Sequence, residues 1–150
     1  MDYQSSRDSI IGQTRVANPG CYATAITLGA TPAAQIADMS DIVVVAASGT
    51  TGAGRSAKTH LLASEVMGSM SSYKFGGVHQ HTPEIEEAIF KATQVSSTLS
   101  FTPILAPQPR GILATISMRT SATRSQIRDA YRDKYAKEKF ITLLDEGAMP

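Results

Sequence analysis

The chain has 150 residues, of which 42% are hydrophobic and 18% charged, and its formal net charge is +1. This size and apolar content suit one domain with a buried core. The low net charge, without runs of like charge, argues against a nucleic-acid or membrane surface, so the expected partners are small molecules or further copies of the chain. A single cysteine excludes an internal disulfide, and no leader-like segment opens the chain, which favours a cytoplasmic protein.

The start of the chain passes from a polar segment to a clear helix signal. Residues 1–15 show neither strand nor helix periodicity, so we expect an irregular lead-in. An asparagine suited to the N-cap and a proline suited to the first helical position then precede the cysteine, in the order Asn18-Pro19-Gly20-Cys21. Cys21 is therefore expected in the first turn of a helix. Residues 20–38 should form two short helices that meet at Pro32.

A buried strand is predicted at residues 42–47, where the side chains are apolar without interruption. It leads directly into a loop of small residues at 48–55 and then into a helix that reaches about Met67. Another helix begins at Thr82-Pro83-Glu84, because this triplet supplies an N-cap, a first-turn proline and an acid favoured by the helix dipole.

The last third of the chain contains two alternating segments and one more helix. Residues 99–105 and 112–118 alternate apolar and polar side chains and are predicted as strands covered on one face. A helix is expected at 125–137, followed by a short strand at 140–144. This order lacks the regular alternation of a doubly wound sheet. We therefore expect an α+β domain with a mixed or antiparallel sheet and helices on one face.

Cys21 is the first candidate for chemistry. Backbone N–H groups at a helix start favour a negative charge, which stabilises the reactive thiolate. The alternative is a small buried hydrophobic residue, which is a common role for a lone cysteine. The composition of the surrounding motif favours the nucleophile.

Thiol chemistry on a carbonyl group also needs a proton shuttle, and histidine is the usual one. His79 and His81 lie just before the predicted helix at Thr82, where Glu84 is within reach to orient one of them. Two histidines at this spacing also resemble half of a metal site. A zinc site needs three or four ligands, and no further cysteine or histidine is suitably placed, so we expect no metal. His60 is assigned to a surface or packing role.

The small-residue loop from Ser48 to Arg55 is a candidate anion site, because its N–H groups and a guanidinium would face a helix start. The alternative is a flexible turn that needs glycine for positive φ. Arg110, between a proline and a glycine, is a candidate clamp for a carboxylate or phosphate, or a solvated turn residue. The loop has the wrong glycine spacing for a dinucleotide-binding fingerprint, and the chain has no P-loop.

Four blocks in the same order strongly resemble the N-acetyl-gamma-glutamyl-phosphate reductases, which are arginine-biosynthetic relatives of aspartate-semialdehyde dehydrogenases. The blocks are Val16-Ala17-Asn18-Pro19-Gly20-Cys21-Tyr22-Ala23-Thr24, Ser48-Gly49-Thr50-Thr51-Gly52-Ala53-Gly54-Arg55, His79-Gln80-His81-Thr82-Pro83-Glu84-Ile85, and Phe101-Thr102-Pro103 with Pro109-Arg110-Gly111-Ile112. The resemblance covers residues from about 16 to 150. It implies a fold like the C-terminal domain of glyceraldehyde-3-phosphate dehydrogenase, which agrees with the element order.

The resemblance also implies a reaction, the NADPH-dependent reduction of N-acetyl-L-glutamyl 5-phosphate to N-acetyl-L-glutamate 5-semialdehyde and phosphate. Carried onto this chain, Cys21 attacks the acyl phosphate to form a thioester, and His81, with His79 as the alternative, moves the proton. Glu84 orients the imidazole or meets the substrate. The resemblance implies these substrate-holding residues: Ser48, Gly49, Arg55 and Arg110. It implies these cofactor contacts: Gly49 and Gly52.

Family members also carry an N-terminal NADP-binding Rossmann domain and a C-terminal segment that returns to it. Neither is present in this chain, so we expect residues 1–150 to form one catalytic and dimerisation domain that is inactive by itself. The resemblance implies that the sheet forms the subunit interface, so a homodimer or homotetramer is expected. The competing readings are a related dehydrogenase acting on aspartyl or aminoadipyl phosphate, and a noncatalytic oligomerisation module.

Overall fold

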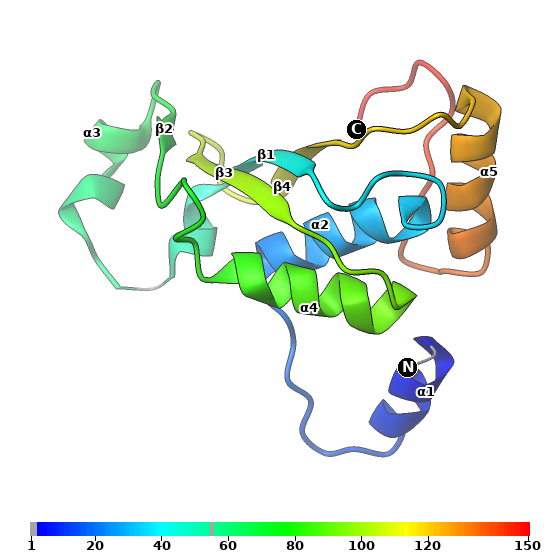
Figure 1. Ribbon diagram of the computed structural model, residues 1–150. Coiled ribbons are helices and arrows are strands. Elements are labelled where there is room, and N and C mark those ends of the chain that lie inside the picture. Colours follow the sequence, from blue (N-terminus) through cyan, green and yellow to red (C-terminus); the bar gives the residue numbers. More distant parts are fainter. Residues whose placement is uncertain (1–2, 55) are drawn as a thin grey trace.

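The computed structural model describes residues 3–54 and 56–150 (Figure 1). Helices and strands alternate irregularly along the chain. The α-helices are α1 (Tyr3–Ile10), α2 (Cys21–Ala30), α3 (Ala63–Val66), α4 (His81–Thr93) and α5 (Arg124–Tyr135). The 3-10 helices are η1 (Thr31–Ala33), η2 (Thr50–Ala53) and η3 (Thr59–Leu61). The strands are β1 (Ile42–Ser48), β2 (Ser71–Ser72), β3 (Leu99–Leu105) and β4 (Ile112–Ser117).

The strands of the described residues form one mixed sheet in the order β2-β3-β1-β4. β1 and β3 are parallel neighbours, with Ile42 opposite Leu99 and Ser48 opposite Leu105. β4 pairs with β1 in the antiparallel direction, and β2 pairs with β3 in the same way. The prediction of an α+β domain with a mixed sheet is confirmed.

One face of the sheet is buried and the other is open. Along β1, Val44 and its even-numbered neighbours are buried, whereas Val43 and Val45 are 44% and 42% exposed. The helices α2 and α4 run side by side across the buried face (Figure 1). The side chains on one face of the strands thus pack against two helices, as predicted for β3 and β4. In β1 the alternation differs from the expected strand that is buried without interruption. The core that results contains these large side chains: Tyr22, Ile26, Ile42, Val44, Ile85, Ile89 and Phe101.

The predicted helix near the C-terminus is confirmed as α5. It begins with a capping box, in which the Thr123 side chain accepts from the Gln126 N–H and the Gln126 side chain accepts from the Thr123 N–H. Two tyrosines attach it to the end of α2, since Tyr135 Oη donates to the Leu28 carbonyl at 2.6 Å and Tyr131 Oη donates to the Gly29 carbonyl.

Two predictions at the ends of the chain are wrong. Part of the lead-in is the helix α1, which has no buried stripe over residues 7–10 and is joined to the domain by the Arg7–Glu138 ion pair at 2.6 Å. The expected strand at 140–144 is irregular, because it has no neighbouring strand to pair with. Phe140 is 93% exposed, so the alternation there does not mark a buried face.

The expected helix after the small-residue loop is also wrong. Only the short η3 and α3 form in this segment, and Val66 is its buried hydrophobic residue among those described. A helix of this length needs an apolar face packed against the core, and here Leu62 and Met67 are exposed. The two-residue strand β2 was not predicted. No helix within residues 3–54 and 56–150 combines the length and apolarity needed to cross a bilayer.

Candidate active site

Cys21 is the first residue of α2, so its place in the first helical turn is confirmed. The N-cap is Gly20 instead of the predicted Asn18, whose side chain donates to the Pro19 carbonyl at 3.2 Å. No side chain caps this helix start. The thiol is exposed. The positive end of the helix dipole therefore faces a reachable sulfur, which is the arrangement that stabilises a thiolate.

The thiol opens into a pocket of about 580 Å³ between the starts of α2 and α4 and the segment from η2 to β2. The charged and nucleophilic side chains that line it are Cys21, Lys58, His60, Lys74, His79 and His81. Among the described residues of this lining there is no Asp or Glu. The pocket therefore favours an anionic ligand.

His81 lies against the residue that precedes the nucleophile. A Cβ atom at Gly20 would be 2.4 Å from His81 Nε2, so the imidazole packs directly on the glycine backbone. Glu84 connects the two, because its Oε1 accepts from the Gly20 N–H at 3.4 Å and its Oε2 lies 3.7 Å from His81 Nε2. His81 Nδ1 is buried without a hydrogen-bond partner among the described residues. The structure thus brings together Cys21, His81 and Glu84, as the sequence predicts.

His79 is buried next to His81 and contacts its backbone. Its ring is 5% exposed, and its Nδ1 accepts a hydrogen bond from the His81 N–H at 3.2 Å. Burial lowers the pKa of His79, and the nearby charges of His81 and Lys74 lower it further. A neutral imidazole whose Nδ1 is an acceptor carries its proton on Nε2. His79 therefore helps to fix the first turn of α4 only while it is neutral.

This lowered pKa predicts a pH dependence of stability. In the unfolded chain His79 binds a proton near its ordinary value of 6.5, whereas in the folded chain it does so only at lower pH. The stabilisation is therefore fully present above about pH 6.5 and is lost as the pH falls through the lowered pKa. We expect the free energy of unfolding, measured by denaturant titration, to fall below pH 6.5 in the wild type and to fall less in His79→Gln.

His60 is the matched control, because it is exposed and lines the same pocket. We expect His60→Gln to keep the pH dependence of the wild type. A His79→Gln variant with the full wild-type slope would contradict the assignment.

The small-residue loop is joined to the turn after β3. The N–H groups of Gly49, Thr50 and Thr51 donate to carbonyls of the opposite turn at 3.0, 2.9 and 3.2 Å. A Cβ at Gly49 would lie 2.6 Å from the backbone N of Arg110, so this glycine permits the close approach of two backbones. Because these N–H groups already have protein partners, they do not form an open anion cradle.

The other predicted residues of this region lie in different surroundings. Ser48 and Gly52 line the pocket, and a Cβ at Gly52 would be 3.0 Å from Ser48 Oγ and 4.0 Å from Cys21 Sγ. Arg110 is exposed and is not part of the pocket lining. Arg55 lies outside the described residues.

The sequence analysis did not assign several side chains of the pocket lining to the site, among them Tyr22, Lys58, Tyr73 and Lys74. Lys58, Tyr73 and Lys74 come from the segment between η2 and α4, whose sequence has no clear periodicity. Lys74 adopts φ +45°, a left-handed conformation that is rare for a residue with a side chain. Tyr22 follows Cys21 directly and was part of the cysteine motif, but it was given no role in the site.

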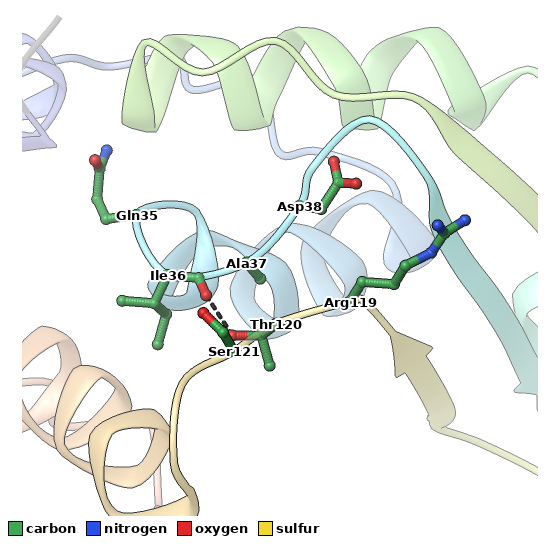
Figure 2. Close-up of a pocket in the computed structure, with 7 residues that line it drawn as sticks. All are labelled: Gln35, Ile36, Ala37, Asp38, Arg119, Thr120 and Ser121. Atoms are coloured by element: carbon green, nitrogen blue, oxygen red, sulfur yellow. Dashed lines mark hydrogen bonds between the residues drawn. The ribbon is translucent and has the colours of Figure 1, made fainter.

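A second hollow, of about 540 Å³, lies between the turn after η1 and the segment after β4 (Figure 2). Figure 2 shows Thr120 bonded to the Ile36 carbonyl across it. Asp38 accepts from the Ser40 side chain at 2.6 Å, a contact that lowers the pKa of its carboxyl group. Arg119 pairs with Asp41 at 2.8 Å. The charged groups here have partners within the chain, so we assign no site to this hollow. The described residues contain no cluster of metal-ligating side chains.

Comparison with known proteins agrees with this geometry. Residues 21–150 match the family described as semialdehyde dehydrogenase, dimerisation domain. N-acetyl-gamma-glutamyl-phosphate reductases of Acidothermus cellulolyticus and Streptomyces avermitilis are 54% and 51% identical over 97% and 96% of this chain. The chain spans 43% of the length of each.

A solved structure shares the fold. Aspartate semialdehyde dehydrogenase II from Vibrio cholerae superposes with a TM-score of 0.57 at 16% identity, over 77% of this chain and 42% of that one. At this identity the likeness concerns the fold alone. The region that matches the family begins at Cys21 and includes the whole sheet. The chain belongs to the semialdehyde dehydrogenase dimerisation-domain family.

Proposed function

We propose that this chain is the catalytic and dimerisation part of an N-acetyl-gamma-glutamyl-phosphate reductase, an enzyme of arginine biosynthesis. The reaction reduces N-acetyl-L-glutamyl 5-phosphate with NADPH to N-acetyl-L-glutamate 5-semialdehyde and phosphate. The observation that carries the proposal is the exposed Cys21 thiol at a helix N-terminus, inside a pocket lined by histidines and lysines. The names of the relatives at 54% and 51% identity favour this acyl phosphate over others.

Cys21 is the proposed nucleophile. Its Sγ attacks the acyl carbon, the bond from that carbon to the phosphate oxygen breaks, and phosphate leaves with the bonding pair. This leaves a thioester on Cys21. When bound, the nicotinamide cofactor supplies the hydride that converts the thioester to a thiohemiacetal. Cleavage of the C–S bond then releases the aldehyde and restores the thiolate.

His81 is the proposed proton shuttle. It takes the proton from the Cys21 thiol before attack, gives it to the thiohemiacetal oxygen, and takes it back as the C–S bond breaks. Support comes from its contact with Gly20, from the unpaired Nδ1 and from Glu84 beside Nε2. His79 is less suited, because its Nδ1 is already occupied by the His81 N–H. We therefore assign His79 and Glu84 the positioning of His81.

The substrate's phosphate and carboxylate need cationic partners. Lys58 and Lys74 are exposed side chains of the pocket lining and are the proposed partners. Arg55 and Arg110 are proposed as further contacts to the substrate, as the family resemblance implies. Ser48 lines the pocket, where its hydroxyl donates to the Gly49 carbonyl at 3.1 Å, and is proposed as a further contact to the substrate.

Gly52 is the residue that best fits the nicotinamide cofactor. Without a side chain it leaves open the space beside Ser48 Oγ and Cys21 Sγ, where a reacting ring must approach the thioester. Gly49, whose N–H donates to the Gly111 carbonyl at 3.0 Å, is assigned a structural role at the same loop. We place the NADPH-binding Rossmann domain, and the segment that returns to it, in the remainder of the full-length protein.

The open face of the sheet is the proposed dimer interface. Val43, Val45 and Leu113 are 44%, 42% and 57% exposed on one surface. β4 pairs with β1, with Leu113 opposite Ala47 and Thr115 opposite Val45, so these side chains form a patch of apolar and small polar residues on one face. A second copy of the chain would cover this patch, in agreement with a family described as a dimerisation domain. A homodimer, alone or within a homotetramer, is therefore proposed.

The test is substrate profiling of the full-length protein in the oxidative direction. N-acetyl-L-glutamate 5-semialdehyde, NADP and phosphate are supplied, and cofactor reduction is followed by absorbance. We expect kcat/KM for this aldehyde to exceed that for aspartate semialdehyde by about 10²-fold or more. Omission of phosphate should abolish turnover, because phosphate is the group that resolves the thioester in this direction.

Two results would contradict the proposal in different ways. Preferential oxidation of aspartate or aminoadipate semialdehyde would retain the chemistry and change the substrate. Absence of turnover with all three aldehydes, together with an intact oligomer, would favour a noncatalytic oligomerisation module.

A further inference from the structure

Two tyrosine hydroxyls at the pocket form a hydrogen-bond chain with a fixed direction. Tyr22 Oη lies 3.2 Å from the Ile104 carbonyl oxygen and 3.1 Å from Tyr73 Oη. A carbonyl only accepts, and a phenol has one proton, so Tyr22 must donate to Ile104. The contact between the two phenols is then made by the proton of Tyr73. The oxygen of Tyr73 keeps its lone pairs and has no proton left to offer.

The chain is held rigidly in the core. Tyr22 is 2% exposed and packs edge-to-face on Phe101 and His79, with ring centroids 5.1 and 5.6 Å apart. The ring centroids of Tyr73 and His79 lie 5.8 Å apart. The backbone N–H of Tyr73 donates to the Pro103 carbonyl at 3.2 Å. Burial raises the pKa of both phenols, so both stay protonated at neutral pH. The acceptor therefore has a fixed position and a fixed protonation state.

Tyr73 presents this acceptor beside the nucleophile. It is partly buried and lines the same pocket as Cys21. The lysines of the same lining, Lys58 and Lys74, can only donate. An anionic oxygen of a ligand is thus favoured near the lysines and disfavoured at Tyr73, where two acceptors would face each other.

The proposed substrate has one donor to match this acceptor. N-acetyl-glutamyl phosphate carries a carboxylate, a phosphate and an acetyl carbonyl, which accept, and a single amide N–H, which donates. Resting on the proposed function, we infer that Tyr73 Oη accepts a hydrogen bond from the amide N–H of an N-acylated substrate. Tyr73 is thereby a specificity-determining residue, which selects acyl phosphates that carry a secondary amide over isosteres that lack the N–H.

The experiment is a cycle between enzyme and substrate, in the full-length protein. The two substrates are N-acetyl-glutamyl phosphate and its ester analogue, 2-acetoxyglutaryl phosphate, in which oxygen replaces the N–H with little change of shape. The two enzymes are the wild type and Tyr73→Phe. We expect the wild type to prefer the amide about tenfold in kcat/KM, the size of one hydrogen bond together with the unfavourable facing of two acceptors. Tyr73→Phe should remove most of this preference.

Each outcome separates this inference from the proposed function. Turnover of the amide by the wild type supports the reductase, whereas no turnover overturns the reductase and the Tyr73 assignment that rests on it. If the wild type turns over both substrates equally, or if Tyr73→Phe slows both by the same factor, Tyr73 is only structural and the inference fails. The wild-type comparison stands even where Tyr73→Phe does not fold. Tyr22→Phe, which frees the proton of Tyr73 to turn toward the pocket, should also weaken the preference for the amide.

Discussion

Replacing Cys21 with serine in the full-length protein is expected to lower kcat by about 10⁴-fold or more, the range seen when a covalent nucleophile is removed. Serine keeps the size of the side chain and its place as the first residue of α2. Its hydroxyl remains protonated even at a helix N-terminus, because an alcohol is a much weaker acid than a thiol. The variant therefore keeps the pocket and loses the attacking atom. Steady-state turnover of the aldehyde is the measurement.

A single-turnover control isolates the chemical step. Mixed with the acyl phosphate in the absence of NADPH, the wild type should release one phosphate per site and stop at the thioester. Cys21→Ser should release none above the rate of spontaneous hydrolysis. Since Cys21 is the only cysteine in the sequence of this chain, a thiol reagent that modifies this chain should abolish the same burst. A normal burst in the serine variant would show that another group forms the covalent intermediate.

Gly20→Ala is expected to lower kcat by about 10²-fold, because a displacement of roughly 1 Å at a catalytic group has effects of this size. The new Cβ would lie 2.4 Å from Nε2 and 2.8 Å from Cε1 of His81, distances that no real contact reaches. The imidazole must then leave its place beside Cys21 and Glu84. Gly20 has φ −64°, which alanine adopts without strain, so the effect comes from the contact and not from the backbone. Steady-state kinetics of the full-length variant measure it.

The matched control is a double-mutant cycle with His81→Ala. His81→Ala alone should be slow, since the shuttle is missing, and adding Gly20→Ala to it should cost little because the atoms that clash are gone. A Gly20→Ala enzyme within about twofold of the wild type would mean that His81 can move without loss, and would contradict its role as the shuttle.

Much of the sheet and its covering helices follows from local pattern. The uninterrupted apolar residues of β1 and the alternation in β3 and β4 leave little choice of structure, and their order already excludes a doubly wound sheet. The predicted starts of α2, α4 and α5 lie within one or two residues of the observed starts. The remaining error has a physical cause, since α2 begins on a bare glycine and α4 begins at His81, before the proline that marks it in the sequence.

The residues of the site likewise fall into those that local pattern predicts and those that it does not. The choice of His81 over His79 came from the family resemblance. Cys21, the two histidines and Glu84 were predictable because they lie at or just before helix starts with a recognisable composition. Lys58 and Tyr73 were not, because they belong to a segment whose position is set by contacts with β3 and with other side chains. Such contacts leave no periodic pattern in the sequence. The direction of the tyrosine protons likewise depends on the Ile104 carbonyl, which is distant in sequence.

Because β1 and β3 are parallel, the pocket at their shared end is lined by two different parts of the chain. Both strands end at the same edge of the sheet, with Ser48 and Leu105 in the pocket wall, and the chain between β1 and α4 makes one long excursion before it returns to the core. This segment supplies the lysines and Tyr73, whereas the helix starts supply the groups that we propose to react. If the proposed function holds, mutation or exchange of this one segment should change which acyl phosphate is accepted while the thiol chemistry is retained. For the proposed reductase, this segment is therefore where we would change the substrate preference.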